Sequence, residues 1–372
     1  MKKQRIIVVV GTRPEAIKMA PVYLAFKKED RAEVLLLATA QHRQMLDQVL
    51  SVFGIRPDID LDIMRPDQTL GELTSSLIRG TQRVFAEVRP DIVLVQGDTT
   101  TCFCGALSAF YERIPVGHVE AGLRTHDLAA PWPEEMNRRL VAPLSRWCFA
   151  PTERAAENLR AERISPESIF VTGNTVIDSL FLARDMGRRV EPTIQGIDKG
   201  VLDGKKMILV TGHRRESFGG PLREFCLALR DIVRAHPTTC LIYPVHLNPN
   251  VQKPVYEILG IEDRVHLIPP VEYIPFVYLM DRSHMIITDS GGIQEEAPSL
   301  RKPVLVTREV TERQEAVEEG LAKLVGTDRR GIFDAASRVL TDRELYARMS
   351  TGSNPYGDGR ASERIVRILL DG

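Results

Sequence analysis

The 372-residue sequence has no excess of charge of one sign, because 49 lysines and arginines are balanced by 50 aspartates and glutamates to a net charge of −1. Proteins that bind nucleic acids usually carry a basic excess, so this balance argues against a nucleic-acid partner. A local basic pocket for one anionic small molecule is still compatible with it. The hydrophobic share of 43% and the charged share of 27% are those of an ordinary globular protein and exclude a disordered chain.

Long hydrophobic runs and cysteine motifs are also absent. The first apolar run, residues 6–10, is too short for the hydrophobic region of a signal peptide. No run approaches the ~20 residues of a membrane-spanning helix. The five cysteines include no Cys-x-x-Cys pair, which argues against a redox motif or a zinc site. We therefore expect buried, reduced thiols and a cytoplasmic protein with no membrane partner.

Short runs rich in β-branched residues alternate with longer helical patterns along the chain. The short runs are continuously apolar, as in parallel strands that are buried on both faces. Helices are predicted over residues 70–88 and 222–235, and strands over residues 6–10, 34–38, 92–96, 115–119, 207–211, 241–243, 285–288 and 304–306. This alternation predicts an α/β fold with doubly wound sheets.

The chain length and one internal similarity predict two domains. At roughly 150 residues per domain, the length suits two or three. The pattern strand, Gly, polar residue, Arg, any residue, Glu occurs at both Gly11 and Gly212, so each half is expected to open with the same strand–turn–helix unit. Residues 188–205 are expected to form the loop before the second sheet. We expect two Rossmann-like domains facing a cleft, with ligands at the carboxyl ends of their strands.

The segment after the first predicted strand contains two cations. Arg13 and Lys18 flank the predicted start of a helix, and the N-terminus of a helix favours anions. Two solvated cations at an ordinary helix start are the simpler alternative. The sequence contains neither the Gly-x-Gly-x-x-Gly motif nor a Walker motif, which argues against dinucleotide and P-loop sites.

Carboxylates follow the next predicted strands of the first half. Asp98 follows strand 92–96, Glu120 follows strand 115–119, and Glu134 opens a helix. Helix capping by Asp98 and helix-dipole complementation by Glu134 are the simpler alternatives. No ligand spacing indicates a metal. Carboxylates gathered without a metal raise one another's pKa and favour acid–base chemistry.

The second half supplies groups that suit a nucleotide diphosphate. A Ser-Gly-Gly turn, residues 290–292, follows strand 285–288, and two glycines there let backbone N–H groups approach a phosphate. Glu296 is placed to accept hydrogen bonds from a sugar diol. His213, after strand 207–211, suits a donor to a departing phosphate oxygen, and Arg313 adds an anion contact. Together the two halves indicate a nucleotide sugar but not which reaction it undergoes.

These segments together resemble the non-hydrolysing UDP-N-acetylglucosamine 2-epimerases of bacteria, which have a glycosyltransferase-B-like fold. The resemblance extends over residues 11–21, 40–50, 97–101, 114–125, 131–137, 172–178, 211–218, 243–250, 288–300, 311–313 and 354–364. It implies catalytic roles for four residues, which are Asp98, Glu120, Glu134 and His213. It implies substrate contacts for eight, which are Arg13, Lys18, Phe276, Ser290, Gly291, Gly292, Glu296 and Arg313.

The resemblance also implies an activity and a domain division. The implied reaction is reversible epimerisation of UDP-N-acetylglucosamine to UDP-N-acetylmannosamine, without a cofactor, through elimination of UDP to 2-acetamidoglucal and its re-addition. The product would feed the synthesis of cell-surface polysaccharide precursors. UDP-N-acetylglucosamine and UDP are the implied partners, and a homodimer is the implied assembly. The acid–base domain would span residues 1–172 with a C-terminal helix, 355–372, packed back on it, and the UDP-binding domain residues 173–354.

The resemblance also bears on regulation and on the choice between related reactions. In regulated relatives a second, activating UDP-N-acetylglucosamine binds beside the first, and four residues match that site: Gln41, Gln44, Arg214 and His246. An arginine of that site is replaced here by Asp67. A hydrolysing epimerase, a glycosyltransferase and a binding-only sensor are the alternatives to the preferred reaction. The sequence does not assign the three acids to the two faces of carbon 2.

Overall fold

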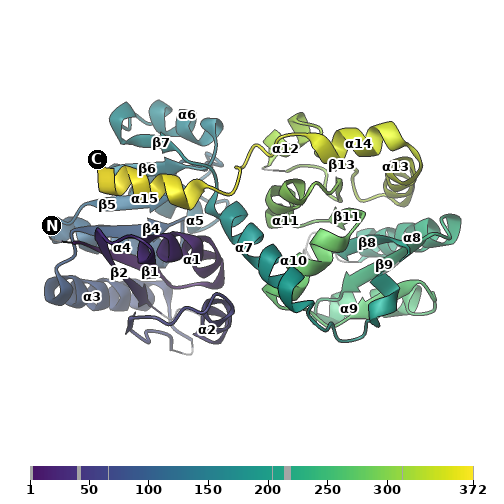
Figure 1. The fold of residues 1–372 in the computed structure, drawn as a ribbon, viewed down its shortest axis with the longest axis horizontal. Helices are drawn as coiled ribbons and strands as arrows, with labels where there is room; N and C mark the ends of the chain where they lie inside the picture. The colour runs from purple at the N-terminus through teal and green to yellow at the C-terminus, as the bar shows by residue number, and fades with distance from the viewer. Residues whose placement is uncertain are drawn as a thin grey trace. The chain divides into compact units, whose positions relative to one another are not determined.

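The chain forms two compact units in the computed structural model, which describes residues 3–39, 43–65, 67–202, 204–212, 219–311 and 313–371 (Figure 1). Unit 1 comprises Met1–Phe181 and Tyr356–Gly372, and unit 2 comprises Leu182–Pro355. The division lies inside helix α7 (Thr175–Val190), whereas the sequence predicts it after residue 172. Each unit has its own sheet and is described by itself.

Unit 1 is built on a seven-stranded sheet whose paired strands are all parallel, in the order β3-β2-β1-β4-β5-β6-β7. The central strands are buried along most of their length because helices cover both faces of the sheet. The strands are β1 (Gln4–Val10), β2 (Ala32–Ala38), β3 (Ile59–Asp60), β4 (Ile92–Gln96), β5 (Val116–Val119), β6 (Trp147–Ala150) and β7 (Ile169–Val171).

The helices of unit 1 include one from the end of the chain. They are α1 (Arg13–Lys27), α2 (Arg43–Val52), α3 (Leu70–Val88), α4 (Thr100–Tyr111), α5 (Glu134–Val141), α6 (Glu153–Ala161) and α15 (Ala361–Asp371). Helix α15 packs against α1 (Figure 1). The buried carboxylate of Asp178 in α7 accepts hydrogen bonds from the backbone N–H groups of Ala361 at 3.2 Å and Ser362 at 2.8 Å, and thereby caps α15.

Unit 2 has a six-stranded parallel sheet in the order β10-β9-β8-β11-β12-β13. Its strands are β8 (Lys206–Thr211), β9 (Thr239–Pro244), β10 (Val265–Ile268), β11 (Met285–Thr288), β12 (Val304–Val306) and β13 (Ala322–Leu324). Its helices are α8 (Gly220–Ala235), α9 (Pro249–Leu259), α10 (Tyr273–Arg282), α11 (Gly291–Glu296), α12 (Gln314–Glu318), α13 (Arg329–Thr341) and α14 (Arg343–Thr351).

Both sheets have the Rossmann strand order, in which the direction of winding reverses beside the first strand. The reversal lies between β1 and β4 in unit 1 and between β8 and β11 in unit 2. Ligands bind at the carboxyl ends of the strands at such a point. The residues to inspect are therefore those that follow these four strands.

The predicted fold class, two Rossmann-like doubly wound α/β domains, is confirmed. Each of the eight predicted strands is present, and so are both predicted helices. Five strands were not predicted from the sequence, which are β3, β6, β7, β10 and β13. Four of them (β3, β7, β10 and β13) are the edge strands of the two sheets and are only partly buried, so they lack the fully buried apolar run that marks a central strand. The loop predicted over residues 188–205 is wrong at its start, because α7 continues to Val190, and a 3₁₀ turn follows at Lys199–Leu202.

Two further predictions concern burial and membranes. All five cysteines are free and buried, as predicted. Within the described ranges, none of the helices has both the length and the apolar character that crossing a bilayer requires.

Candidate active site

The turn after β4 carries Asp98. Gly97 has a left-handed backbone with a φ of 73°, which turns the chain out of the buried strand at no steric cost. The cap of α4 is Thr99, whose hydroxyl accepts a hydrogen bond from the backbone N–H of Cys102 at 3.0 Å. The alternative in which Asp98 caps this helix is therefore wrong.

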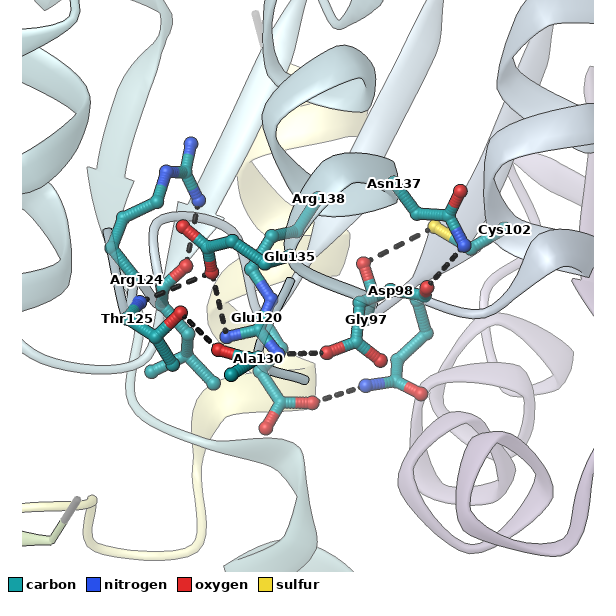
Figure 2. Close-up of polar contacts among 12 residues, drawn as sticks. Gly97, Asp98, Cys102, Glu120, Arg124, Thr125, Ala130, Glu135, Asn137 and Arg138 are labelled. Atoms are coloured by element: carbon teal, nitrogen blue, oxygen red, sulfur yellow. Dashed lines mark hydrogen bonds and ion pairs between the residues drawn. The ribbon is translucent and has the colours of Figure 1, made fainter. Parts of the chain in front are cut away.

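Helix α5 holds Asp98 by two of its side chains (Figure 2). Nη2 of Arg138 donates to Oδ2 of Asp98 at 2.5 Å. Nδ2 of Asn137 donates to the backbone carbonyl oxygen of Asp98 at 2.9 Å. Both the main chain and the carboxylate of Asp98 are thus fixed by the same helix.

Opposed electrostatic effects act on the Asp98 carboxyl. Burial raises its pKa above the usual value, and the nearby carboxylates of Glu120 and Glu134 raise the pKa further. The cations of Arg138 and Lys18 lower the pKa. A carboxyl whose pKa lies above its usual range is suited to exchange a proton closer to neutral pH.

Glu120 follows β5 directly and has a left-handed backbone with a φ of 65°, a conformation that residues other than glycine seldom adopt. Its carboxylate is buried and binds Nζ of Lys18 through both oxygens, at 2.5 and 2.6 Å. The side-chain amides of Gln96 and Asn174 also donate to it, that of Asn174 at 3.4 Å. The buried charge is thus paired and hydrogen-bonded, as burial of a charge requires. Such strain on a polar residue at a strand end is typical of functional sites.

The first turn of α5 carries two acids that differ in burial. Glu134 is partly exposed, whereas Glu135 is fully buried. Glu135 accepts hydrogen bonds from the backbone N–H groups of Thr125 at 3.1 Å and His126 at 3.2 Å, so it joins the loop after β5 to the helix. Helix-dipole complementation does not account for Glu135, whose role in the structure is to anchor this loop.

The turn after β1 places Arg13 at the start of α1. Thr12 caps the helix, and Arg13 and Pro14 are its first and second residues. The side chain of Arg13 is half-buried.

Glu15 joins the turn after β1 to the turn after β4. Its fully buried carboxylate accepts hydrogen bonds from the backbone N–H groups of Gly11 at 2.9 Å and Thr12 at 2.7 Å, and from the hydroxyl of Thr99 at 2.6 Å. Burial raises the pKa of Glu15 to about 6, although these hydrogen bonds oppose the rise. Glu15 thereby fixes the segment of Arg13 against the segment of Asp98.

In unit 2, the Ser-Gly-Gly turn lies against an ion pair. Ser290 is the N-cap residue of α11, and Nε of Arg313 donates to Oε1 of Glu295 at 3.0 Å. A methyl group on Gly291 would lie 2.9 Å from Cζ of Arg313, so glycine allows the guanidinium to approach this turn. A methyl group on Gly292 would meet no heavy atom within 4 Å, which leaves that side of the turn open.

Glu296, the last residue of α11, is buried and accepts a hydrogen bond from the hydroxyl of Tyr273 at 3.1 Å. Tyr273 is the first residue of α10, and Phe276 lies one turn later on the same helix with a partly buried ring. Two neighbouring helices of unit 2 therefore carry the residues that the resemblance assigns to UDP binding.

The residues matched to an activating site are only partly described. His246 is exposed and its Nδ1 accepts from the backbone N–H of Asn248 at 3.1 Å. Gln41, His213 and Arg214 lie outside the described residues, and so does the side chain of Gln44.

Several residues of the site were not found from the sequence, notably Gln96, Asn174, Arg138 and Tyr273. Gln96 is a polar residue at the end of an apolar strand, the same signal that identifies Glu120. Arg138 lies one helical turn after Glu134, and this spacing is visible in the sequence. Lys18 and Glu120 are 102 positions apart in the sequence, and only the structure shows that they pair.

Over the part of the chain that the structure describes, no group of three or more His, Cys, Asp or Glu side chains is placed to hold a metal ion. The arrangement in unit 1 offers proton exchange by carboxylates, and that in unit 2 offers a glycine turn beside a guanidinium and a buried carboxylate.

The chain is similar to UDP-N-acetylglucosamine 2-epimerases over nearly its whole length. The sequence model of the family described as "UDP-N-acetylglucosamine 2-epimerase" matches residues 24–370. A UDP-N-acetylglucosamine 2-epimerase of Yersinia pestis is 55% identical over 368 residues, which cover 98% of this chain and 98% of that protein.

Solved structures show the same similarity. A crystal structure of UDP-GlcNAc 2-epimerase from Neisseria meningitidis bound to UDP-GlcNAc is 49% identical, with a TM-score of 0.87 and coverage of 99% of this chain and 100% of that chain. A structure of S. aureus MnaA with UDP is 45% identical, with a TM-score of 0.85 and coverage of 99% and 97%.

Proposed function

This chain belongs to the UDP-N-acetylglucosamine 2-epimerase family, whose members are isomerases, and we propose that it interconverts UDP-N-acetylglucosamine and UDP-N-acetylmannosamine. The observation that carries the proposal is the group of carboxylates at the ends of β4 and β5 and at the start of α5, where the charges of Glu120 and Glu134 raise the pKa of Asp98. The Neisseria meningitidis relative binds UDP-GlcNAc, which supports the same substrate here.

The proposed reaction proceeds by elimination and re-addition. Carbon 2 of the sugar has no adjacent carbonyl group, so its deprotonation alone would leave an unstabilised carbanion. When a carboxylate removes the carbon-2 proton and the bond between carbon 1 and the UDP oxygen breaks, the electron pair of the C–H bond forms the double bond of 2-acetamidoglucal and UDP leaves as an anion. Protonation of carbon 2 on the opposite face, with attack of the UDP oxygen on carbon 1, yields the epimer.

Two faces of one carbon require two acid–base positions, and unit 1 offers three candidates. Asp98, Glu120 and Glu134 belong to three different segments, so they approach the sugar from different elements. The buried carboxylate of Glu120 is bound by Nζ of Lys18 at 2.5 Å. We assign proton exchange to these three acids.

The UDP moiety is assigned mainly to unit 2. The backbone N–H groups of the Ser-Gly-Gly turn suit a phosphate, and the carboxylate of Glu296 suits a ribose diol. Phe276 and Arg313 complete this set, with Arg13 contributing from unit 1. His213 is assigned the protonation of the departing UDP oxygen. These donors would stabilise the charge that develops on UDP in the elimination step.

The solvent-exchange experiment tests the reaction itself. The protein is incubated with UDP-N-acetylglucosamine in heavy water, and carbon 2 is followed by NMR and mass spectrometry. We expect UDP-N-acetylmannosamine with deuterium at carbon 2, because the proton that returns comes from a carboxyl in exchange with solvent.

The alternatives to this reaction give other results in the same experiment. Free N-acetylmannosamine as the sole sugar product indicates a hydrolysing epimerase. A UDP-linked sugar that stays unlabelled and unconverted indicates a glycosyltransferase or a binding-only protein. Either result contradicts the proposal.

Replacing Gly291 with alanine tests the assignment of UDP to unit 2. The added methyl group would lie 2.9 Å from Cζ of Arg313, so we expect the guanidinium to shift and its 3.0 Å contact with Glu295 to break. UDP affinity, measured by calorimetry, should fall about tenfold, the cost of roughly one charge-assisted hydrogen bond. Gly71→Ala is the control, since a methyl group there meets no heavy atom within 4 Å. Wild-type affinity in Gly291→Ala would remove Arg313 from the UDP site.

Three implications of the resemblance stay predictions. They are the homodimer, the supply of polysaccharide precursors and activation by a second substrate molecule. The last is weakened by Asp67, which stands where regulated relatives have an arginine.

A further inference from the structure

We propose that Arg138 is a positioning residue for Asp98, which fixes the direction of the carboxylate that exchanges the carbon-2 proton. The inference rests on the proposed function, because it assigns Arg138 a part in the same reaction. Neither the sequence patterns nor the resemblance assigned a role to this arginine.

Two side chains of helix α5 bind Asp98, one at its carboxylate and one at its main chain (Figure 2). The guanidinium of Arg138 reaches Oδ2 of Asp98 at 2.5 Å, while Asn137, the preceding residue of α5, holds the Asp98 carbonyl oxygen at 2.9 Å. The same helix therefore holds both the main chain of Asp98 and its carboxylate. The position of the carboxylate therefore depends on where α5 places the guanidinium.

A second carboxylate, that of Glu135, lies beside the guanidinium of Arg138. Its Nη1 lies 3.6 Å from Oε2 of Glu135, and Glu135 is fully buried and bound to two backbone N–H groups of the loop after β5. Only 12% of the Arg138 side chain is exposed. A guanidinium can bind a carboxylate on each of two sides at fixed angles, whereas an ammonium group is a point charge without that directionality. The pair of contacts therefore selects arginine.

The charged and titratable groups that face Asp98 come from several elements. Arg138 and Glu134 lie on α5, Glu120 follows β5, Lys18 lies on α1 and Cys102 on α4. Among them Arg138 exerts the strongest lowering effect on the pKa of Asp98, against the raising effect of burial. When this cation is removed, burial and the neighbouring carboxylates still raise the pKa of Asp98, and less positive charge lowers it. The pKa of Asp98 therefore rises.

Arg138→Met and Arg138→Lys are compared with the wild type over a range of pH. In Arg138→Met we expect at least one limb of the profile of kcat/KM against pH to move to higher pH by about one unit or more. We also expect the maximal kcat to fall about tenfold or more, because the carboxylate is no longer aimed at carbon 2. Arg138→Lys should keep both limbs near their wild-type positions, since the charge remains, and should recover part of kcat. KM and UDP affinity should stay within about twofold in both variants.

The outcomes separate this inference from the proposed function. A wild-type protein that does not label carbon 2 in heavy water contradicts the proposed function. If the wild-type protein labels carbon 2, but Arg138→Met keeps the wild-type kcat and the wild-type profile of kcat/KM against pH, the role of Arg138 is contradicted. Thermal unfolding and UDP binding of each variant report on its fold. If the loss of activity follows only the loss of folded protein, or if Arg138→Lys shows the same limb shift as Arg138→Met, the positioning role is also contradicted.

Discussion

Replacement of Asp98 with asparagine is expected to lower kcat by about 10²- to 10⁴-fold, the range that one positioned acid or base contributes. The substitution keeps the shape of the side chain and an oxygen that can still accept from Arg138, so the turn after β4 should stay in place. UDP affinity should change by less than about threefold, because UDP is assigned mainly to unit 2. Turnover is measured by NMR and UDP binding by calorimetry.

The matched control for this variant is Asp91→Asn, at the other end of the same strand. Asp91 precedes β4 and accepts a hydrogen bond from the backbone N–H of Arg5 at 2.7 Å, which asparagine can also accept. We expect Asp91→Asn to retain wild-type turnover. Full activity of Asp98→Asn would remove Asp98 from the catalytic set, and a loss of UDP binding would show that the substitution disturbs more than proton exchange.

Glu120→Gln is expected to remove turnover and to lower stability together. The side chain of Lys18, which is only 18% exposed, would lose the negative charge of the carboxylate that binds its Nζ at 2.5 Å. Loss of one partner of a buried ion pair costs about 3–5 kcal/mol of unfolding free energy. Denaturant unfolding measures this loss, and heavy-water exchange at carbon 2 measures catalysis.

Two companion variants separate the two effects of Glu120→Gln. The double variant Lys18→Met with Glu120→Gln removes both charges, so it should regain much of the stability and remain inactive. Glu162→Gln breaks a different pair, in which Nη2 of the buried Arg124 binds Glu162 at 2.7 Å, and it should lower stability while the folded protein keeps its turnover. Restored turnover in the double variant would show that Glu120 acts through stability alone.

The parts of the site that the sequence predicts share one physical signal. Glu120 is an acid directly after an apolar strand, where a solvated carboxylate has little reason to lie, and Asp98 stands two residues after the end of another. Parallel strands bring their carboxyl ends to one edge of the sheet. The signal is local in the chain, so it can be read without the structure. The same reasoning correctly predicted the doubly wound fold, since each long buried strand is a continuous apolar run.

The parts that could not be predicted are pairings across the fold. Arg138 binds Asp98 from 40 positions away, and no local pattern indicates which acid an arginine on a helix will meet. The sequence places Lys18 near the start of a helix as a cation, and only the structure shows that Glu120 binds it. Glu15 forms a capping box with Thr12, and only the structure shows that its buried carboxylate also binds Thr99 of another turn.

The return of α15 to unit 1 has a consequence for synthesis on the ribosome. Unit 1 contains both the first described residues and the last helix, whereas unit 2 is one continuous insertion, Leu182–Pro355. Chains emerge at about 5–20 residues per second, so unit 2 can complete its sheet while unit 1 still lacks the helix that covers α1. The N–H groups at the start of α15 reach their acceptor, Asp178, only after the whole of unit 2 has been made. The synthesis of unit 1 therefore begins before that of unit 2 and ends after it.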